Sequence, residues 1–350
     1  MLGLPRPGGA LTRKARALGA PVLLSANAFA IYARRSSSAE PRRFLRFNER
    51  LLAHLDGIDE VVLDSAGFVC HRLMERFPWP ADAYVAFASN PRFKRWSSLD
   101  FACELEIAQT PEVVFDRISQ STRMNFVCAR LADKYGSRER FMPVIQSGAD
   151  PTGYLRSIEQ LEGLLYPGIH IGVGSMCRRP IHSPTGALRA ATLIAQRLPE
   201  ATFHYFGLKS GGLSALSGVR DGCTADSQAY GVAARQEAFK AGHAKPDWWV
   251  AEIAEDWWRR QLAEASRFVT ASIPSFDIAE GLCAPPGPTD RLARAREQVR
   301  QLVRDGDLPL YANHEWWAWQ LYADSADDGD DDVIAAVSAH PCLAPASVGA

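Results

Sequence analysis

The chain has 350 residues, of which 47% are hydrophobic and 23% charged, and its formal net charge at pH 7 is −1. This is the composition of an ordinary soluble protein with a large core, and no apolar run reaches the roughly 18–20 residues that a membrane helix needs. The seven cysteines include no C-x-x-C pair, which argues against a disulfide scaffold or a zinc ribbon and favours a reducing cytoplasm.

Charge is unevenly distributed along the chain. Residues 1–50 carry ten Lys and Arg against two Asp and Glu, whereas the last thirty residues carry six Asp and no Lys or Arg. The basic N-terminal segment either contacts a polyanion or is simply an exposed arm. The acidic run at 327–332 indicates a solvated, flexible tail.

Short apolar segments alternate with helical patterns. The predicted strands are 22–25, 61–64, 99–106, 141–146, 170–173, 202–206 and 222–226, with 268–273 as a candidate eighth. The predicted helices are 44–55, 110–135, 150–165 and 183–198, and a Pro follows an N-cap residue at the start of the last three. This alternation predicts a parallel sheet.

Eight such strands would close a (β/α)8 TIM barrel, which is the fold class that we predict. The alternative is an open doubly wound sheet, which usually has a Gly-rich phosphate loop that residues 25–29 lack. We expect a barrel core over residues 1–246, including the basic N-terminal segment. We expect a helical, Trp- and Arg-rich extension over 247–322, which can contain the last strand, and an acidic tail over 323–350. For the tryptophans of the extension, a packing role is favoured over base stacking.

Two of the predicted strands end in Asp-Ser. Asp64 follows the apolar residues 61–63, and Asp226 ends the segment 222–226. Polar residues at the carboxyl ends of barrel strands line the active site, so two such acids suit chemistry at an electrophilic carbon. Taken alone, each Asp is equally well explained as the N-cap of the following helix.

Five motifs in chain order resemble those of the guanine transglycosylases, which exchange a guanine in nucleic acid for a 7-deazaguanine. They are Asp64-Ser65-Ala66-Gly67-Phe68, Pro143-Val144-Ile145-Gln146, Ile171-Gly172-Val173-Gly174-Ser175, Phe206-Gly207-Leu208-Lys209 and Asp226. The resemblance covers residues 20–235. Segments 98–104, 172–179 and 206–209 are most similar to the DNA-modifying branch, the 7-deazaguanine DNA transglycosylases of phage and bacterial genomic islands.

One departure from the family concerns metal. The tRNA enzymes of the family carry a C-x-C-x-x-C…His zinc site after the nucleophile strand. Here Cys223 and Cys283 are the only cysteines in that region, so a zinc site of this type cannot form. We therefore expect no metal and no cofactor, and DNA as the substrate in place of tRNA.

The resemblance assigns the nucleophile to Asp226 and the proton-handling acid to Asp64. It implies two displacements at C1′ through a covalent Asp–deoxyribose intermediate. The base-reading carboxylate is either Glu104 or Glu106, because alternation from Asp100 turns both to one face of the predicted strand; Asp100 itself is expected to be structural. The other expected substrate-binding residues are Ser65, Gln146, Gly172, Gly174 and Lys209.

A base stacked in a duplex is out of reach, so the target guanine must be flipped out or single-stranded. Arg178 and Arg179 are expected to hold phosphates, with salt bridges to neighbouring helices as the alternative. The expected partners are DNA, a free 7-deazaguanine base such as 7-cyano-7-deazaguanine and proteins of a DNA-modification system, with no membrane involved. The competing functions are a tRNA-directed enzyme, a non-catalytic nucleic-acid-binding paralogue acting as a partner subunit, and an unrelated barrel glycosidase.

Overall fold

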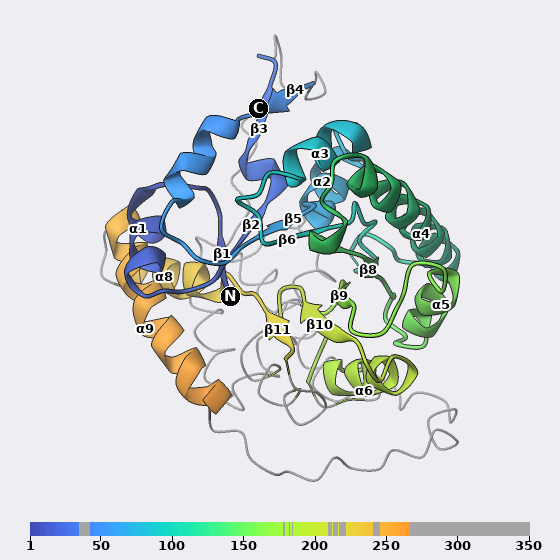
Figure 1. Cartoon of the computed structure of the whole chain (residues 1–350). Helices are drawn as coiled ribbons and strands as arrows, with labels where there is room; N and C mark the ends of the chain where they lie inside the picture. The colour runs from blue at the N-terminus through green and yellow to red at the C-terminus, as the bar shows by residue number, and fades with distance from the viewer. Residues whose placement is uncertain are drawn as a thin grey trace, which may run out of the picture.

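The computed structural model describes residues 1–34, 43–104, 106–177, 179–181, 183, 185–208, 212, 216, 222–240 and 246–266. Over these residues the chain is a mixed α/β protein in which helices surround a central group of strands (Figure 1). The predicted α/β class with parallel strand pairing is confirmed.

Two parallel sheets form the centre. The first has five strands in the order β1 (Leu2–Leu4), β2 (Val22–Ser25), β5 (Val61–Asp64), β6 (Arg95–Ser97) and β7 (Phe141–Met142). The second has four, in the order β11 (Thr224–Ala225), β10 (Thr202–Tyr205), β9 (His170–Val173) and β8 (Val144–Ile145). The side chains of Leu24, Leu63, Trp96, Ile145 and Phe203 are completely buried, as expected for parallel strands covered by helices.

The two sheets approach each other at both edges. Pro143 alone separates β7 from β8, and a proline, which has no N–H, cannot donate to the strand ladder. At the other edge Leu2 forms a parallel bridge with Ser227, and the Gly3 amide donates to the Ser227 carbonyl at 3.0 Å.

The helices follow the strands along the chain. They are α1 (Gly9–Ala17), α2 (Gly67–Met74), α3 (Ala81–Ala88), α4 (Pro111–Lys134), α5 (Gly153–Gln160), α6 (Ala187–Arg197), α8 (Ala229–Lys240) and α9 (Asp247–Ser266). Short 3-10 helices cover Ala26–Ala28, Glu49–Leu55 and Arg138–Arg140. The predicted start of α4 is confirmed, because the side chain of Thr110 accepts a hydrogen bond from the Val113 amide and Pro111 is the first helical residue.

Helix α9 packs against α1 and α8. Lys14 of α1 forms an ion pair with Glu252 at 3.0 Å, and the Trp257 ring lies 5.8 Å from that of Tyr230. Trp258 is buried, whereas Trp248 is exposed. Residues 247–266 therefore lie against elements of the predicted core, with packing roles for two of their tryptophans.

A two-stranded antiparallel hairpin leaves the fold between β2 and β5. It consists of β3 (Ala30–Tyr32) and β4 (Phe44–Phe47) and lies at the top of Figure 1. The Phe44 and Phe47 rings contact Trp79 at centroid distances of 5.9 and 5.3 Å, which anchors one side of the hairpin.

Several predicted elements differ from the structure. The predicted strands 22–25, 61–64 and 170–173 are confirmed, but the described residues of the segment 99–106, which are 99–104 and 106, are not in a strand. The strand there is β6, because Trp96 pairs with Leu63 and Phe141, and the Ser98 amide makes the last bond to the neighbouring strand. Residues 44–55 form a strand and a 3-10 helix rather than one helix. The candidate strand 268–273, the rest of the predicted Trp- and Arg-rich extension and the acidic tail lie outside the described residues.

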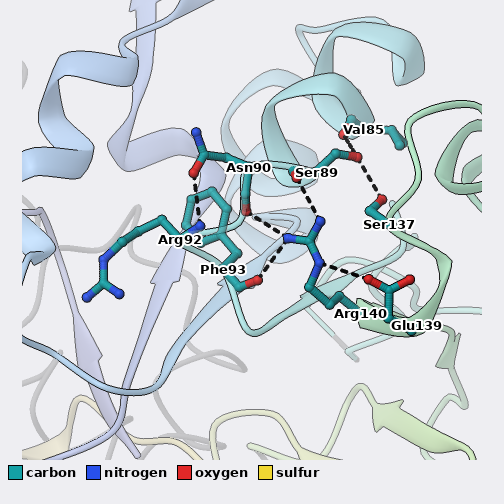
Figure 2. A network of polar contacts seen from close by, with 8 residues as sticks. All are labelled: Val85, Ser89, Asn90, Arg92, Phe93, Ser137, Glu139 and Arg140. Atoms are coloured by element: carbon teal, nitrogen blue, oxygen red, sulfur yellow. Dashed lines mark hydrogen bonds and ion pairs between the residues drawn. The ribbon is translucent and has the colours of Figure 1, made fainter.

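Arg140 ties together the loops before β6 and β7 (Figure 2). Its guanidinium donates to the carbonyls of Ser89, Asn90 and Phe93 at 2.9, 2.9 and 3.2 Å, and the Ser89 and Ser137 hydroxyls lie 2.7 Å apart. The network lies where these parallel strands begin, whereas Asp64 lies at the opposite end. It is therefore a stabilising device, away from the predicted chemistry.

Candidate active site

The predicted site residues gather at the carboxyl ends of the parallel strands. Asp64 is the last residue of β5, Gln146 follows β8, Gly174 follows β9 and Asp226 follows β11. Since neighbouring strands run in the same direction, these ends share one rim of the fold.

Asp64 is held in place by one hydrogen bond from the neighbouring strand β2 and one from its own turn. Its Oδ2 atom accepts hydrogen bonds from the Ser25 hydroxyl at 2.8 Å and from the Ala66 amide at 3.0 Å. Burial raises the pKa of Asp64 above its usual value, and the negative charge of Asp226 adds to this shift, which outweighs the two hydrogen bonds. Asp64 is thereby suited to carry a proton.

Asp226 has the opposite character. Its Oδ1 atom accepts a hydrogen bond from the Gly207 amide at 2.9 Å and lies 3.3 Å from Nε2 of His204. Burial by itself would raise the pKa of Asp226, but His204 and the Gly207 amide outweigh burial and hold this pKa below its usual value. Gly207 has φ +66°, a left-handed conformation that favours glycine.

Asp64 and Asp226 are close enough for their charges to interact, yet their pKa values shift in opposite directions. Paired carboxyl groups with separated pKa values divide the roles of acid and nucleophile in other enzymes. The arrangement can therefore supply a proton from Asp64 and an ionised carboxylate from Asp226.

A third acid, Asp100, lies in the loop after β6 and is buried. Its Oδ1 accepts from the Ser65 hydroxyl and its Oδ2 from Nε2 of Gln146, both at 2.5 Å. The Ser175 hydroxyl donates to Oε1 of Gln146 at 2.7 Å, which fixes the orientation of the amide. Burial, followed by the charge of Asp64, raises the pKa of Asp100 to about 7.

Glu104 and Glu106 do not share the face of a strand, contrary to expectation, because residues 98–104 and 106–108 are not in a strand. The acid that hydrogen bonds with Ser65 and Gln146 is Asp100, which was expected to be structural. Glu104 is buried further along the loop, where its Oε1 lies 3.9 Å from Sγ of Cys177 and its charge raises the pKa of Asp100. Glu106 is only partly buried.

The two predicted glycines make room for neighbouring side chains. A Cβ atom on Gly174 would lie 2.2 Å from Nε2 of Gln146, so glycine allows that amide its position. A Cβ on Gly172 would lie 2.6 Å from the ring of Phe206. Both glycines therefore allow a neighbouring protein side chain to lie close to the backbone.

Arg179 holds the rim loops. Its guanidinium donates to the carbonyls of Ser175 at 3.1 Å, Ala149 at 2.9 Å and Thr185 at 2.8 Å, and also to that of Gly148. These bonds use four of its five N–H groups on backbone carbonyls rather than on the acids of neighbouring helices. The other predicted phosphate or substrate contacts, Arg178 and Lys209, lie outside the described residues.

Sequence reasoning missed His204, which lies beside the predicted nucleophile, and Ser25, which bonds Asp64. A usable signal for His204 was its place in an otherwise apolar and aromatic strand just before the Phe206-Gly207 turn. For Ser25 the signal was its position as the last residue of the first predicted strand.

The described residues contain no group of three or more His, Cys, Asp or Glu side chains arranged to hold a metal ion. Within the same part of the chain, no helix has both the length and the apolar character needed to cross a membrane.

The chain matches a known protein family. The model of the family described as DpdA, DeoxyPurine in DNA protein A, matches residues 40–287, which is more than half of the chain. A comparison with curated protein sequences finds no match.

Proposed function

The chain belongs to the DpdA family, the DNA 7-deazaguanine transglycosylases of the guanine transglycosylase superfamily, and we propose that it exchanges guanine in DNA for a 7-deazaguanine base such as 7-cyano-7-deazaguanine. The proposal is carried by one observation. Asp64 and Asp226 lie on one rim and interact, their pKa values shift in opposite directions, and the buried Asp100–Gln146 pair lies on the same rim. Base exchange needs an acid, a nucleophile and a group that reads a planar base.

In this proposal the two parallel sheets form a closed (β/α)8 barrel. Support comes from the Leu2–Ser227 bridge at one edge and from the single residue Pro143 at the other. With β7 and β8 counted as one interrupted strand, the described strands of the two sheets make eight, and β1 takes the place expected for 268–273. Barrel enzymes carry their active sites at the carboxyl ends of the strands, where Asp64 and Asp226 lie.

The exchange proceeds in two displacements. The Asp226 carboxylate attacks C1′ of the deoxyribose, the C1′–N9 bond breaks, and guanine leaves after taking the proton of Asp64. The incoming 7-deazaguanine then gives a proton to Asp64 while its N9 attacks C1′, and the Asp226–sugar ester bond breaks. Two inversions retain the configuration, and both acids return to their starting states.

Asp100 and Gln146 are the proposed base-reading pair. An ionised Asp100 accepts from N1–H and the exocyclic amine of guanine, and the Gln146 amide donates to O6. The base then replaces the direct Asp100–Gln146 hydrogen bond, while the Ser65 and Ser175 hydroxyls keep both side chains oriented. This role for Asp100 takes the place of the role expected for Glu104 or Glu106.

DNA must deliver a flipped or single-stranded guanine to this rim. Because Arg179 is engaged with backbone carbonyls, we assign phosphate contacts first to the β3–β4 hairpin and the turn after it, which start five residues beyond Ser25. Among the described residues of this segment, the exposed arginines are Arg34, Arg43, Arg46 and Arg50. Exposed guanidinium groups suit sequence-independent binding to a phosphate backbone.

The test measures base exchange directly. Purified protein is incubated with unlabelled 7-cyano-7-deazaguanine and either DNA or tRNA that carries radiolabelled guanine, and release of label is followed. We expect release from DNA and none from tRNA. Release from tRNA alone would indicate the tRNA-directed enzyme, and release from neither would contradict a catalytic role for the chain. Metal analysis of the active protein is expected to find no stoichiometric zinc, because the zinc motif of the tRNA enzymes is missing from the sequence.

A further inference from the structure

His204 is a buried polar residue beside the proposed nucleophile. It lies on β10, is 1% exposed, and is opposite Thr224 in the register of β10 with β11. Its Nδ1 atom lies 2.8 Å from the Thr224 hydroxyl oxygen, and its Nε2 atom lies 3.3 Å from Oδ1 of Asp226. The ring is thus fixed on one side by the strand register and faces the carboxylate on the other.

These two contacts determine where the ring proton lies. The Thr224 hydroxyl can donate to Nδ1, which leaves the proton of a neutral imidazole on Nε2, directed at Asp226. The other tautomer would point the lone pair of Nε2 at a carboxylate oxygen. A neutral His204 therefore directs an N–H at Oδ1 of Asp226 across 3.3 Å, although the contact does not meet hydrogen-bond geometry, and a protonated His204 would attract the carboxylate more strongly.

The two oxygens of Asp226 are not equivalent. Oδ1 receives the Gly207 amide at 2.9 Å and faces His204, whereas the hydrogen bonds that other described residues donate to Asp226 include none to Oδ2. An oxygen to which none of the described residues donates keeps its lone pairs for attack. An oxygen with two donors is suited to become the ester carbonyl and to accept charge again when the ester breaks.

We infer that His204 is a positioning residue, which together with Gly207 holds Oδ1 of Asp226 and leaves Oδ2 as the atom that attacks C1′. This inference rests on the proposed function, in which Asp226 is the nucleophile. The bond formed is Oδ2–C1′ and the bond broken is C1′–N9, so His204 gives up no proton in either displacement.

Other charged groups also act on this pair. Asp64 on β5 feels the charges of both Asp226 and His204, and His170 on β9 feels that of His204. The Met1 amino group and Tyr230 of α8 are coupled to Asp226. A test must therefore separate the effect of His204 from a general change of charge at the rim.

The sequence provides a matched control on the neighbouring strand. His170 lies with Nδ1 2.8 Å from the hydroxyl of Thr202, as His204 does with Thr224, but it is the first residue of β9 and therefore at the end of the strand away from the rim. The experiment compares His204→Phe, His204→Gln and His170→Gln. Circular dichroism and thermal unfolding verify that each variant is folded.

The first readout is the dependence of kcat/KM for base exchange on pH. For His204→Phe we expect kcat to fall by no more than about tenfold. We also expect the acid limb of the kcat/KM profile to move to higher pH by about one unit, because Asp226 loses the N–H group that faces it. His204→Gln keeps a donor and should restore most of the wild-type acid limb. His170→Gln should leave the profile unchanged. A His204→Phe profile with the wild-type acid limb and kcat would overturn the inference.

The second readout is independent of activity. Protein labelled with 13C at the aspartate carboxyl carbons is titrated by NMR, and the Asp226 signal is assigned from its loss in Asp226→Asn. We expect the Asp226 carboxyl to titrate at higher pH in His204→Phe than in wild type. If wild type exchanges no guanine, the proposed function fails, and this titration still decides the effect of His204 on Asp226. An unchanged Asp226 titration would overturn the inference even if exchange is observed.

Discussion

Gln146 donates a hydrogen bond from Nε2 to Oδ2 of Asp100 at 2.5 Å, and both side chains are buried at the rim that carries Asp64 and Asp226. A carboxyl group in this position is unfavourable when ionised, and burial raises the pKa of Asp100 to about 7. The protein thus maintains, at a cost in stability near neutral pH, a group that suits recognition of a base.

The first prediction concerns stability. The folded-state pKa of Asp100 is about 7 against 3.8 for the free side chain, so the folded state binds more protons between these values. The contribution of Asp100 to the free energy of unfolding is therefore fully present at low pH and is lost as the pH rises from about 4 to 7. The loss has an upper limit of roughly 4 kcal/mol, at about 1.4 kcal/mol per pKa unit.

Asp100→Asn removes this loss. Thermal unfolding should show the variant gaining stability relative to wild type as the pH rises from 4.5 to 8, while its exchange activity falls. The exposed Asp59 offers a control, and Asp59→Asn should give the same difference in Tm at both pH values. A constant difference between Asp100→Asn and wild type across this range would mean that Asp100 has an ordinary pKa.

The second prediction concerns Gly174. A Cβ atom there would lie 2.2 to 2.6 Å from the amide atoms of Gln146, so Gly174→Ala must displace that side chain. We expect the KM for the free 7-deazaguanine base to rise about tenfold or more, because a misplaced amide leaves a base hydrogen bond unmade. Gly231→Ala on α8, where a Cβ meets nothing within 4 Å, should leave this KM unchanged. An unchanged KM in Gly174→Ala would remove Gln146 from base recognition.

The third prediction concerns the network in Figure 2. Arg140→Gln removes the guanidinium from the carbonyls of Ser89, Asn90 and Phe93 at the end of the strands away from the site. Leaving such groups unsatisfied should lower the free energy of unfolding by roughly 2–3 kcal/mol. Below the unfolding transition, kcat/KM should remain near wild type. Arg138→Gln, which loses an ion pair with Asp133 and a guanidinium contact with the Phe141 ring but frees no backbone carbonyls, should cost about 1 kcal/mol by chemical denaturation. Equal losses for the two variants would contradict the role of the network.

The strand-end acids could be predicted from sequence because a buried parallel strand is a continuous apolar run, and residues 61–63 and their neighbour Asp64 show this directly. The position of Asp100, the proposed base-reading acid, could not be predicted in this way. Alternation from Asp100 to Glu106 imitates a strand, but pairing ends at Ser98, and the following loop turns Asp100 towards Gln146. Loop direction depends on tertiary contacts that a local pattern does not contain.

His204 illustrates the same limit. A histidine in an apolar strand is more often a satisfied core residue than part of a site, and its proximity to Asp226 depends on the register of β10 with β11. Strand β1 was missed because its three residues are too few for a periodic signal. Both features became visible only when distant segments were placed together.

The most direct measurement is detection of the covalent intermediate. Wild-type protein and Asp226→Asn are incubated with guanine-containing DNA without any acceptor base, denatured, digested and analysed by mass spectrometry. We predict a deoxyribose–DNA adduct on the peptide that contains Asp226 in wild type, its disappearance when 7-cyano-7-deazaguanine is added, and no adduct in Asp226→Asn. Full exchange activity in Asp226→Asn, or an adduct on another residue, would contradict the assignment of Asp226 as the nucleophile.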